Sequence, residues 1–170
     1  KKQEVGAGIA LDSVGNIVVM DTTNSNDYPL ASPLQSAHAG HNDFFVTKLS
    51  NDGASLIFST YLGGSKQDDG ESIAIGSDDA IYLTGHSRSQ QSFPSLQNAS
   101  PVIGNGRDAF VVKLAATGNA IEYSTFVGGW YSDEATDIAV HEQGRATIVG
   151  VTDSYYDFPV VNPSQWTCGG

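Results

Sequence analysis

The sequence is poor in cysteine and in basic residues. Cys168 carries the only thiol among 170 residues, so no disulfide can form within the chain and the redox compartment stays open. Eight Lys and Arg residues stand against 19 Asp and Glu residues, a formal net charge of −11. Unspecific binding to nucleic acid or to an anionic membrane surface needs a basic protein, so we expect neither partner. The acidic excess fits a secreted protein exposed to salt, or cation binding.

Long apolar runs and helical periodicity are also missing. No run approaches the roughly 20 apolar residues that a membrane-spanning helix needs, so we expect no membrane insertion. No window repeats its apolar residues with a period of 3.6, whereas short apolar stretches alternate with turn residues. Apolar residues make up 39% of the chain and glycine occurs 19 times. The sequence therefore predicts a globular, mostly antiparallel all-β protein.

A repeat of 65 residues organises the chain. Residues 59–64, Ser-Thr-Tyr-Leu-Gly-Gly, return at 124–129 as Ser-Thr-Phe-Val-Gly-Gly. Further blocks recur at the same offset: residues 43–49 with 108–114, Tyr28-Pro29 with Phe93-Pro94 and Phe158-Pro159, and Ile73-Ala74 with Ile138-Ala139. A unit of this length suits a β-propeller blade that contains one long connection.

Three units follow from this alignment: 1–64, 65–129 and 130–170. We expect β-propeller blades of four antiparallel strands, two of them complete and a third with only its first two strands plus a long loop. The predicted strands are 8–11, 16–20, 43–49 and 55–61 in the first unit, 72–75, 80–84, 108–114 and 120–126 in the second, and 137–140 and 145–149 in the third. Either face of the strand 44–49 could point into the core, because both faces of a propeller sheet are covered by neighbouring structure.

The connection between the second and third strands is long in both complete units. We expect its aromatic-proline pair to fix it onto the sheet. Gly64 and Gly129 should be indispensable to the link between units if they adopt φ > 0. Neither end of the chain coincides with a unit boundary, which predicts a part of a longer polypeptide, or chains that complete each other's half blade in an oligomer.

These motifs resemble one known family. Asp-Phe-Phe-Val-Thr-Lys-Leu (43–49), Phe-Ser-Thr-Tyr-Leu-Gly-Gly (58–64), Asp-Asp-Gly (68–70), Tyr-Leu-Thr-Gly (82–85) and Phe93-Pro94 are similar to the bacterial seven-bladed β-propeller repeat called SBBP. The resemblance covers essentially the whole chain. It implies a blade of a large secreted or surface-anchored bacterial or archaeal protein, and the family supplies no catalytic residues.

Acidic residues recur beside each glycine link. Glu4, Asp68 and Asp133 occupy equivalent positions, and Asp69 corresponds to Glu134. A carboxylate repeated at a turn usually accepts backbone N–H groups and ties neighbouring units together. The alternative is calcium, which prefers oxygen ligands, bound by Asp68, Asp69, Asp133 and Glu134. No Asp-x-Asp-x-Asp-Gly loop supports it, and we expect no other cofactor.

Loop aromatic residues are the other candidates. Trp130, Tyr131, Tyr155 and Tyr156 either pack between units or stack on sugar rings as a glycan-binding site. His38, His41, His86 and His141 lack the spacing of a zinc site. Asn98-Ala99-Ser100 is a glycosylation sequon, meaningful only where the source glycosylates its surface proteins.

The sequence offers no nucleophile or catalytic motif, so we expect no enzyme. The leading hypothesis is a non-catalytic extracellular propeller module for scaffolding, adhesion or surface assembly within a longer protein. Its partners would be neighbouring blades or identical copies. The alternative is a polysaccharide-binding propeller accessory to a secreted hydrolase.

Overall fold

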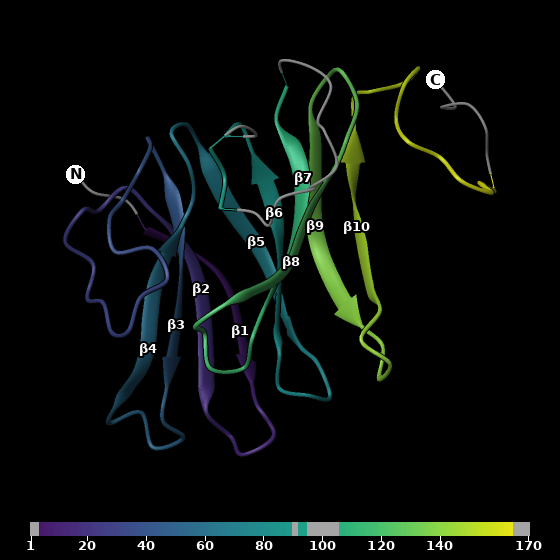
Figure 1. Cartoon of the computed structure of the whole chain (residues 1–170). Coiled ribbons are helices and arrows are strands. Elements are labelled where there is room, and N and C mark those ends of the chain that lie inside the picture. The colour runs from purple at the N-terminus through teal and green to yellow at the C-terminus, as the bar shows by residue number, and fades with distance from the viewer. Residues whose placement is uncertain (1–3, 90–91, 95–105, 165–170) are drawn as a thin grey trace.

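The computed structural model describes residues 4–89, 92–94 and 106–164, and these form an all-β protein without any helix. The all-β prediction is confirmed. Within these residues no helix offers the length and apolarity that crossing a bilayer requires. Figure 1 shows the strands running side by side along one direction of the molecule. They are β1 (Glu4–Leu11), β2 (Ile17–Thr23), β3 (Asp43–Leu49), β4 (Leu56–Leu62), β5 (Asp68–Ile75), β6 (Ile81–Ser87), β7 (Asp108–Leu114), β8 (Ile121–Val127), β9 (Asp133–Val140) and β10 (Ala146–Thr152).

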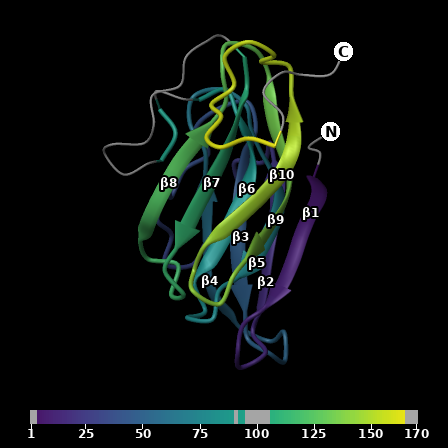
Figure 2. The same ribbon diagram turned by 90° about the vertical axis from the view of Figure 1, so that its right-hand side faces the viewer.

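The strands form three open antiparallel sheets. The first has the order β1-β2-β3-β4, the second β5-β6-β7-β8, and the third consists of β9 and β10. The sheets stack on one another, with the second between the other two (Figure 1). In the view of Figure 2 the third sheet lies nearest the reader. The predicted groups of four, four and two antiparallel strands are therefore present.

Each sheet begins with a bulged hairpin in the same place. The pairing shifts between Gly6 and Gly8 in the first sheet and between Gly70 and Ser72 in the second. A corresponding shift separates Val149 from Gly150 in the third sheet. The first strand of each unit begins earlier than predicted, because a bulge lets a strand continue through glycine and acidic residues that are typical of a turn. The strands instead start at Glu4, Asp68 and Asp133.

A large apolar core joins the first and second sheets. Phe44 of β3 stacks on Phe110 of β7 with 5.1 Å between the ring centroids. Thirteen buried residues belong to this core: Val18, Met20, Phe44, Val46, Phe58, Leu62, Ile81, Leu83, Phe93, Phe110, Val112, Leu114 and Phe126. Between the second and third sheets the buried cluster is smaller and contains Ala80, Tyr82, Val111 and Ile138.

The long connection 24–42 covers the other face of the first sheet. Tyr28 stacks on Phe45 at 3.9 Å, and its hydroxyl lies 3.1 Å from the Thr47 hydroxyl. Both faces of β3 are thus buried. In the second unit Phe93 contacts Phe110 in the same way, with the centroids 5.1 Å apart. The prediction that the aromatic-proline pair fixes this connection onto the sheet is confirmed for Tyr28 and Phe93.

The glycine links are tight for a reason other than the one expected. The sequence made the need for glycine at these links conditional on φ > 0, and Gly64 and Gly129 are not among the described residues with positive φ. A Cβ atom on Gly64 would instead lie 2.6 Å from Cβ of Ser89, and one on Gly129 would lie 2.8 Å from Cβ of Ser154. Such distances are shorter than real Cβ contacts, so glycine is needed because two chain segments approach closely.

Two features singled out in the sequence, Cys168 and the sequon at Asn98, lie outside the described residues.

Candidate functional site

One buried carboxylate holds each glycine link. Oδ2 of Asp68 accepts the N–H of Gly64 at 2.6 Å and the Ser89 hydroxyl at 2.7 Å, and the Ser87 hydroxyl donates to Oδ1. At the next link Oδ2 of Asp133 accepts the N–H of Gly129 at 2.8 Å. The Ser154 hydroxyl donates to the same oxygen, also at 2.8 Å. The predicted role in accepting backbone N–H groups is therefore confirmed for both aspartates.

A second buried aspartate, which was not among the predicted site residues, adjoins each link. Asp43 is fully buried, and its Oδ2 accepts the Ala39 N–H at 2.8 Å and the Gln35 side-chain amide at 3.1 Å. Oδ1 of Asp43 is buried and has no hydrogen-bond partner among the described residues. A Cβ atom on Gly63 would lie 2.5 Å from this oxygen. The signal was available, since Asp43 and Asp108 occupy the same repeat position and Asp108 adjoins Gly128 in the same way.

Burial dominates the electrostatics of this pair. It raises the pKa of Asp43, and the nearby charge of Asp68 acts in the same direction. Burial also raises the pKa of Asp68, although the bonds from Ser87 and Gly64 oppose it. A carboxylate taken out of water resists ionisation unless a positive charge or enough donors compensate it. Folding therefore shifts both carboxyls toward their protonated form relative to an exposed aspartate.

The remaining predicted metal ligands point elsewhere. Asp69 follows Asp68 in β5, and neighbouring residues of a strand face opposite sides. Its Oδ2 lies 3.1 Å from Nε2 of His86, and the Gln67 amide donates to it at 2.6 Å. Burial works against ionisation of Asp69, but these bonds and the one from Asn42 lower its pKa.

Glu134 forms an ion pair with Arg107. The structure thus does not bring Asp69 and Glu134 into one ligand set with Asp68 and Asp133. In residues 4–89, 92–94 and 106–164, no three His, Cys, Asp or Glu side chains are grouped as metal ligands. Calcium binding stays a prediction.

The histidines are dispersed. Nδ1 of His86 is 3.7 Å from Oε1 of Glu71, so this ring stands between two carboxylates of β5. His38 lies edge-on to Tyr61 with 5.9 Å between centroids. His41 lies in the connection between β2 and β3, whereas His141 lies in the turn between β9 and β10.

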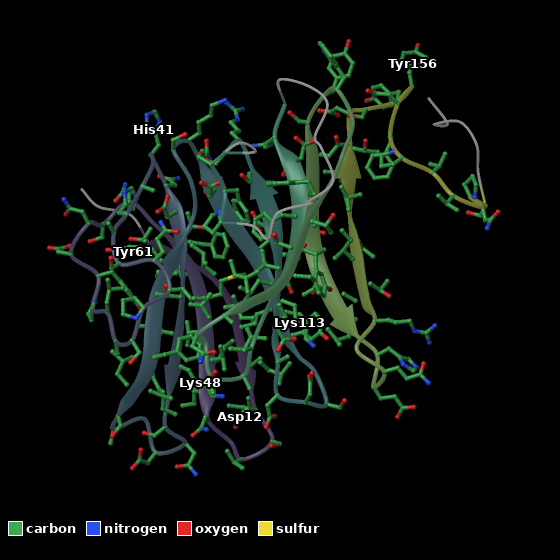
Figure 3. All side chains as sticks on the ribbon, viewed as in Figure 1. Asp12, His41, Lys48, Tyr61, Lys113 and Tyr156 are labelled. Carbon is green, nitrogen blue, oxygen red and sulfur yellow. The ribbon has the colours of Figure 1, made fainter. Side chains whose placement is uncertain are left out.

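The four loop aromatic residues lie on two neighbouring segments, the link before β9 and the connection after β10. Two backbone hydrogen bonds join their segments: the Trp130 N–H donates to Oδ2 of Asp157 at 2.8 Å, and the Tyr131 N–H donates to Oγ of Ser154 at 3.0 Å. All four rings are exposed, from 51% for Trp130 to 97% for Tyr156, which Figure 3 shows extending away from the strands. We call this group the aromatic rim: Trp130, Tyr131, Tyr155 and Tyr156.

The equivalent link of the second unit shows that the fold does not need these rings. There the Ser65 N–H donates to Oγ of Ser92, and the Lys66 N–H donates to Oγ of Ser89, both at 2.8 Å. Serine and lysine thus adopt the same bonded backbone as Trp130 and Tyr131. Of the two roles proposed for these rings, burial between units does not occur within the described chain.

No protein-family model matches the chain. Among curated proteins, no significant sequence match is found.

Proposed function

We propose that the chain is a non-catalytic, extracellular β-propeller module that serves as a scaffold within a longer protein. The observation that carries the proposal is the repetition of one sheet. Asp43 pairs with Thr23 and Leu49 with Ile17, and the second sheet repeats this with Asp108 opposite Ser87 and Leu114 opposite Ile81. Sheets of four antiparallel strands that bury both faces against neighbours are the building unit of propellers.

The use of the polar residues supports a structural role. The repeated aspartates and serines bond each glycine link to the sheet that follows it. Their polar atoms are therefore used to hold the backbone in place. The resemblance to the SBBP repeat, together with a net charge of −11, favours a secreted or surface-anchored bacterial or archaeal protein. Adhesion or surface assembly would then use the exposed connections.

An affinity screen against soluble and insoluble polysaccharides tests this proposal. The scaffold hypothesis expects no retention and no release of sugar or peptide from any substrate. Specific retention by one polysaccharide would contradict it and favour the second candidate.

That second candidate is a polysaccharide-binding propeller accessory to a secreted hydrolase. It is favoured by the aromatic rim, whose rings are exposed although the link forms equally well with Ser65 and Lys66. Aromatic faces beside polar groups suit sugar rings. Asp157 and Ser154 supply such groups next to Trp130 and Tyr131.

The repeat provides a matched variant for this candidate. Trp130→Ser with Tyr131→Lys installs the residues of the equivalent link, so the backbone bonds should persist while the rings are lost. Retention on a polysaccharide that falls at least about tenfold in this variant, with an unchanged melting temperature, would support glycan binding. Equal retention of both proteins would exclude the rim as its site.

A further inference from the structure

In the described chain, β10 lies at the edge of the third sheet, whereas the corresponding strands of the other two sheets, β2 and β6, each have a neighbour on both sides. Strand β10 corresponds to β6 at an offset of 65, and β6 pairs with β5 on one side and β7 on the other. In the described chain β10 pairs only with β9. Val149 and Val151 of β10 are 60% and 64% exposed, whereas their equivalents Thr84 and His86 are buried. An edge strand with exposed apolar side chains is a template for another strand.

A cavity of about 340 Å³ lies beside β10 toward its Thr152 end. It is lined by Ala109 and Val127 of the second sheet, by Ile148 and Val151 of β10, and by Phe158. At the equivalent place between the first two sheets, Phe110 fills the space beside Phe44 and Phe93. Ala109 and Phe158 occupy the positions of Phe44 and Phe93 in the repeat. The cavity therefore lies where the third residue of a strand equivalent to β7, an aromatic residue in β7 itself, would place its side chain.

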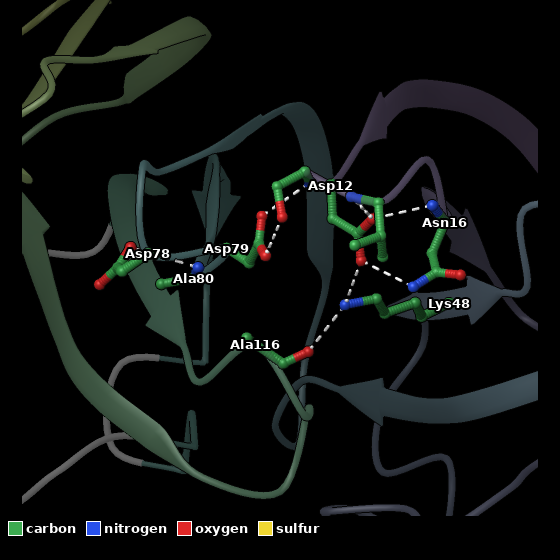
Figure 4. A network of polar contacts seen from close by, with 9 residues as sticks. Asp12, Asn16, Lys48, Asp78, Asp79, Ala80 and Ala116 are labelled. Atoms are coloured by element: carbon green, nitrogen blue, oxygen red, sulfur yellow. Dashed lines mark hydrogen bonds and ion pairs between the residues drawn. The ribbon is translucent and has the colours of Figure 1, made fainter.

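A second cavity of about 460 Å³ lies at the other end of the sheets, beside the turn 141–145. Tyr82, Lys113 and Tyr123 line it, together with Glu122 and Gly144. Between the first two sheets the equivalent space holds the β7–β8 turn. There Nζ of Lys48 donates to the Ala116 carbonyl at 3.0 Å, as Figure 4 shows, and also pairs with Asp12 at 2.9 Å.

Glycine allows that turn to approach. A Cβ atom on Gly118 would lie 2.6 Å from the Phe58 ring, so only glycine lets the turn lie against it. Lys113 and Tyr123 are the equivalents of Lys48 and Phe58. The second cavity thus lies where a glycine-containing hairpin turn equivalent to the β7–β8 turn would pack.

We propose that the two cavities and the β10 edge are one docking surface for a β-hairpin of this chain's own repeat type. Its first strand pairs antiparallel with β10, with aspartate opposite Thr152 and leucine opposite Ala146, as Asp108 and Leu114 pair with β6. Its third residue, aromatic, enters the first cavity, and the glycine of its turn covers Tyr123 in the second. Addition of a strand to a sheet edge gains affinity from backbone hydrogen bonds and specificity from such pockets. The inference rests on the proposed propeller module and specifies its partner.

A synthetic peptide of residues 108–127, added to the full chain, tests the docking surface. Fluorescence anisotropy measures binding, and hydrogen exchange locates it. We expect saturable binding with slowed exchange at residues 146–152. A scrambled peptide should not bind, and peptides with Phe110→Ser or Gly118→Val should bind at least about tenfold more weakly.

A variant of the protein itself provides the matched control. Val149→Lys with Val151→Lys changes two exposed positions, so the fold should persist while peptide binding is lost. Failure of the peptide to bind, binding that the lysine variant retains, or protection at β1 or β4 in place of β10 would each overturn the proposal. Protection of β10 without peptide, abolished by the lysine variant, would identify a second copy as the occupant and overturn it also.

Failure here is separable from failure of the proposed function. Specific polysaccharide binding would contradict the scaffold while leaving peptide docking intact. A peptide that does not bind, with polysaccharide retention still absent, would remove only the docking surface.

Discussion

The interface between the first and second sheets differs from the one between the second and third sheets. The first joins two complete sheets through a core rich in stacked aromatic rings. The second rests on Tyr82 and Ile138 with a few smaller neighbours. The strands that face each other are repeats of the same sequence pattern. The difference thus arises from the third and fourth strands of a sheet and the turn between them. Both sheets at the first interface contain these elements, whereas at the second interface only the second sheet does.

The comparison predicts that the largest loss of stability follows from truncation at the first interface. Phe110→Ala removes a ring that contacts both Phe44 and Phe93, and replacing a buried phenylalanine by alanine costs about 3–5 kcal/mol. Val149→Ala, at the open edge, should cost less than about 1 kcal/mol because the side chain is exposed. Urea unfolding of the two variants measures both values. Equal losses would show that the two interfaces contribute alike.

Lys48 and Lys113, which occupy the same repeat position, allow a second comparison of the two interfaces. Lys48 and Asp12 are almost completely buried, so Lys48→Met leaves a buried carboxylate without its cation and should cost about 3 kcal/mol. Lys113 pairs with Asp78 and Glu122 at 3.0 Å and 2.8 Å, but both acids are well exposed. Lys113→Met should therefore cost less than about 1 kcal/mol. Thermal and urea unfolding provide the measurement, and a larger loss for the Lys113 variant would reverse the comparison.

Two glycines distinguish the cost of a close contact from the cost of a left-handed backbone: Gly64 is crowded, whereas Gly53 has positive φ. Gly64→Ala places a Cβ atom against Ser89 and Ser92, so we expect a loss of about 1–3 kcal/mol from overpacking. Gly53 has φ of 70° in open space, and Gly53→Ala should cost about 1 kcal/mol through the left-handed conformation alone. Melting temperatures of the two variants decide the order. A milder effect at Gly64 would mean that the link can widen without cost.

Much of this fold was predictable because the repeat displays each strand at least twice. The apolar stretches, the turns and the aromatic-proline pairs all recur at one offset, and the strands lie where they recur. The bulges were missed because Gly70 and Asp68 have the composition of a turn, and only the pairing partner shows that the strand continues. The reason for glycine at Gly64 was not predictable, because a sequence displays the backbone freedom of glycine but not the approach of Ser89 from a distant segment.

The candidate sites were less predictable for a similar reason. Asp68 and Asp69 look equivalent in sequence, yet alternation along β5 sends them to unrelated partners. The exposure of Trp130 could not be read from its type, since a large ring is equally suited to burial. The structure shows the ring 51% exposed, and the same hydrogen-bonded link built with Ser65 shows that the link does not need it.

The smallest predicted effect concerns pH and again contrasts the two interfaces. Burial alone would raise the pKa of Asp12, but hydrogen bonds from Lys48 and Asn16 lower it to about 2 from an ordinary value of 3.8. A carboxyl whose pKa is lowered by folding stabilises the protein above its ordinary pKa, and this contribution disappears as pH falls toward the lowered value. Between pH 4 and pH 2 we therefore expect Asp12 to account for about 1–2 kcal/mol of lost stability.

Asp12→Asn should flatten that part of the pH profile, as measured by urea unfolding across the acid range. Asp78→Asn is the matched control: Lys113 lowers the pKa of Asp78 as well, but the exposed carboxyl is screened by solvent and should change the profile little. Asp43 and Asp68, whose pKa values are raised by burial, act in the opposite direction, because their contribution is present at low pH and is lost as pH rises through the raised values. An acid limb unchanged by Asp12→Asn, or flattened equally by Asp78→Asn, would show that the buried pair at the first interface is no stronger than the exposed one at the second.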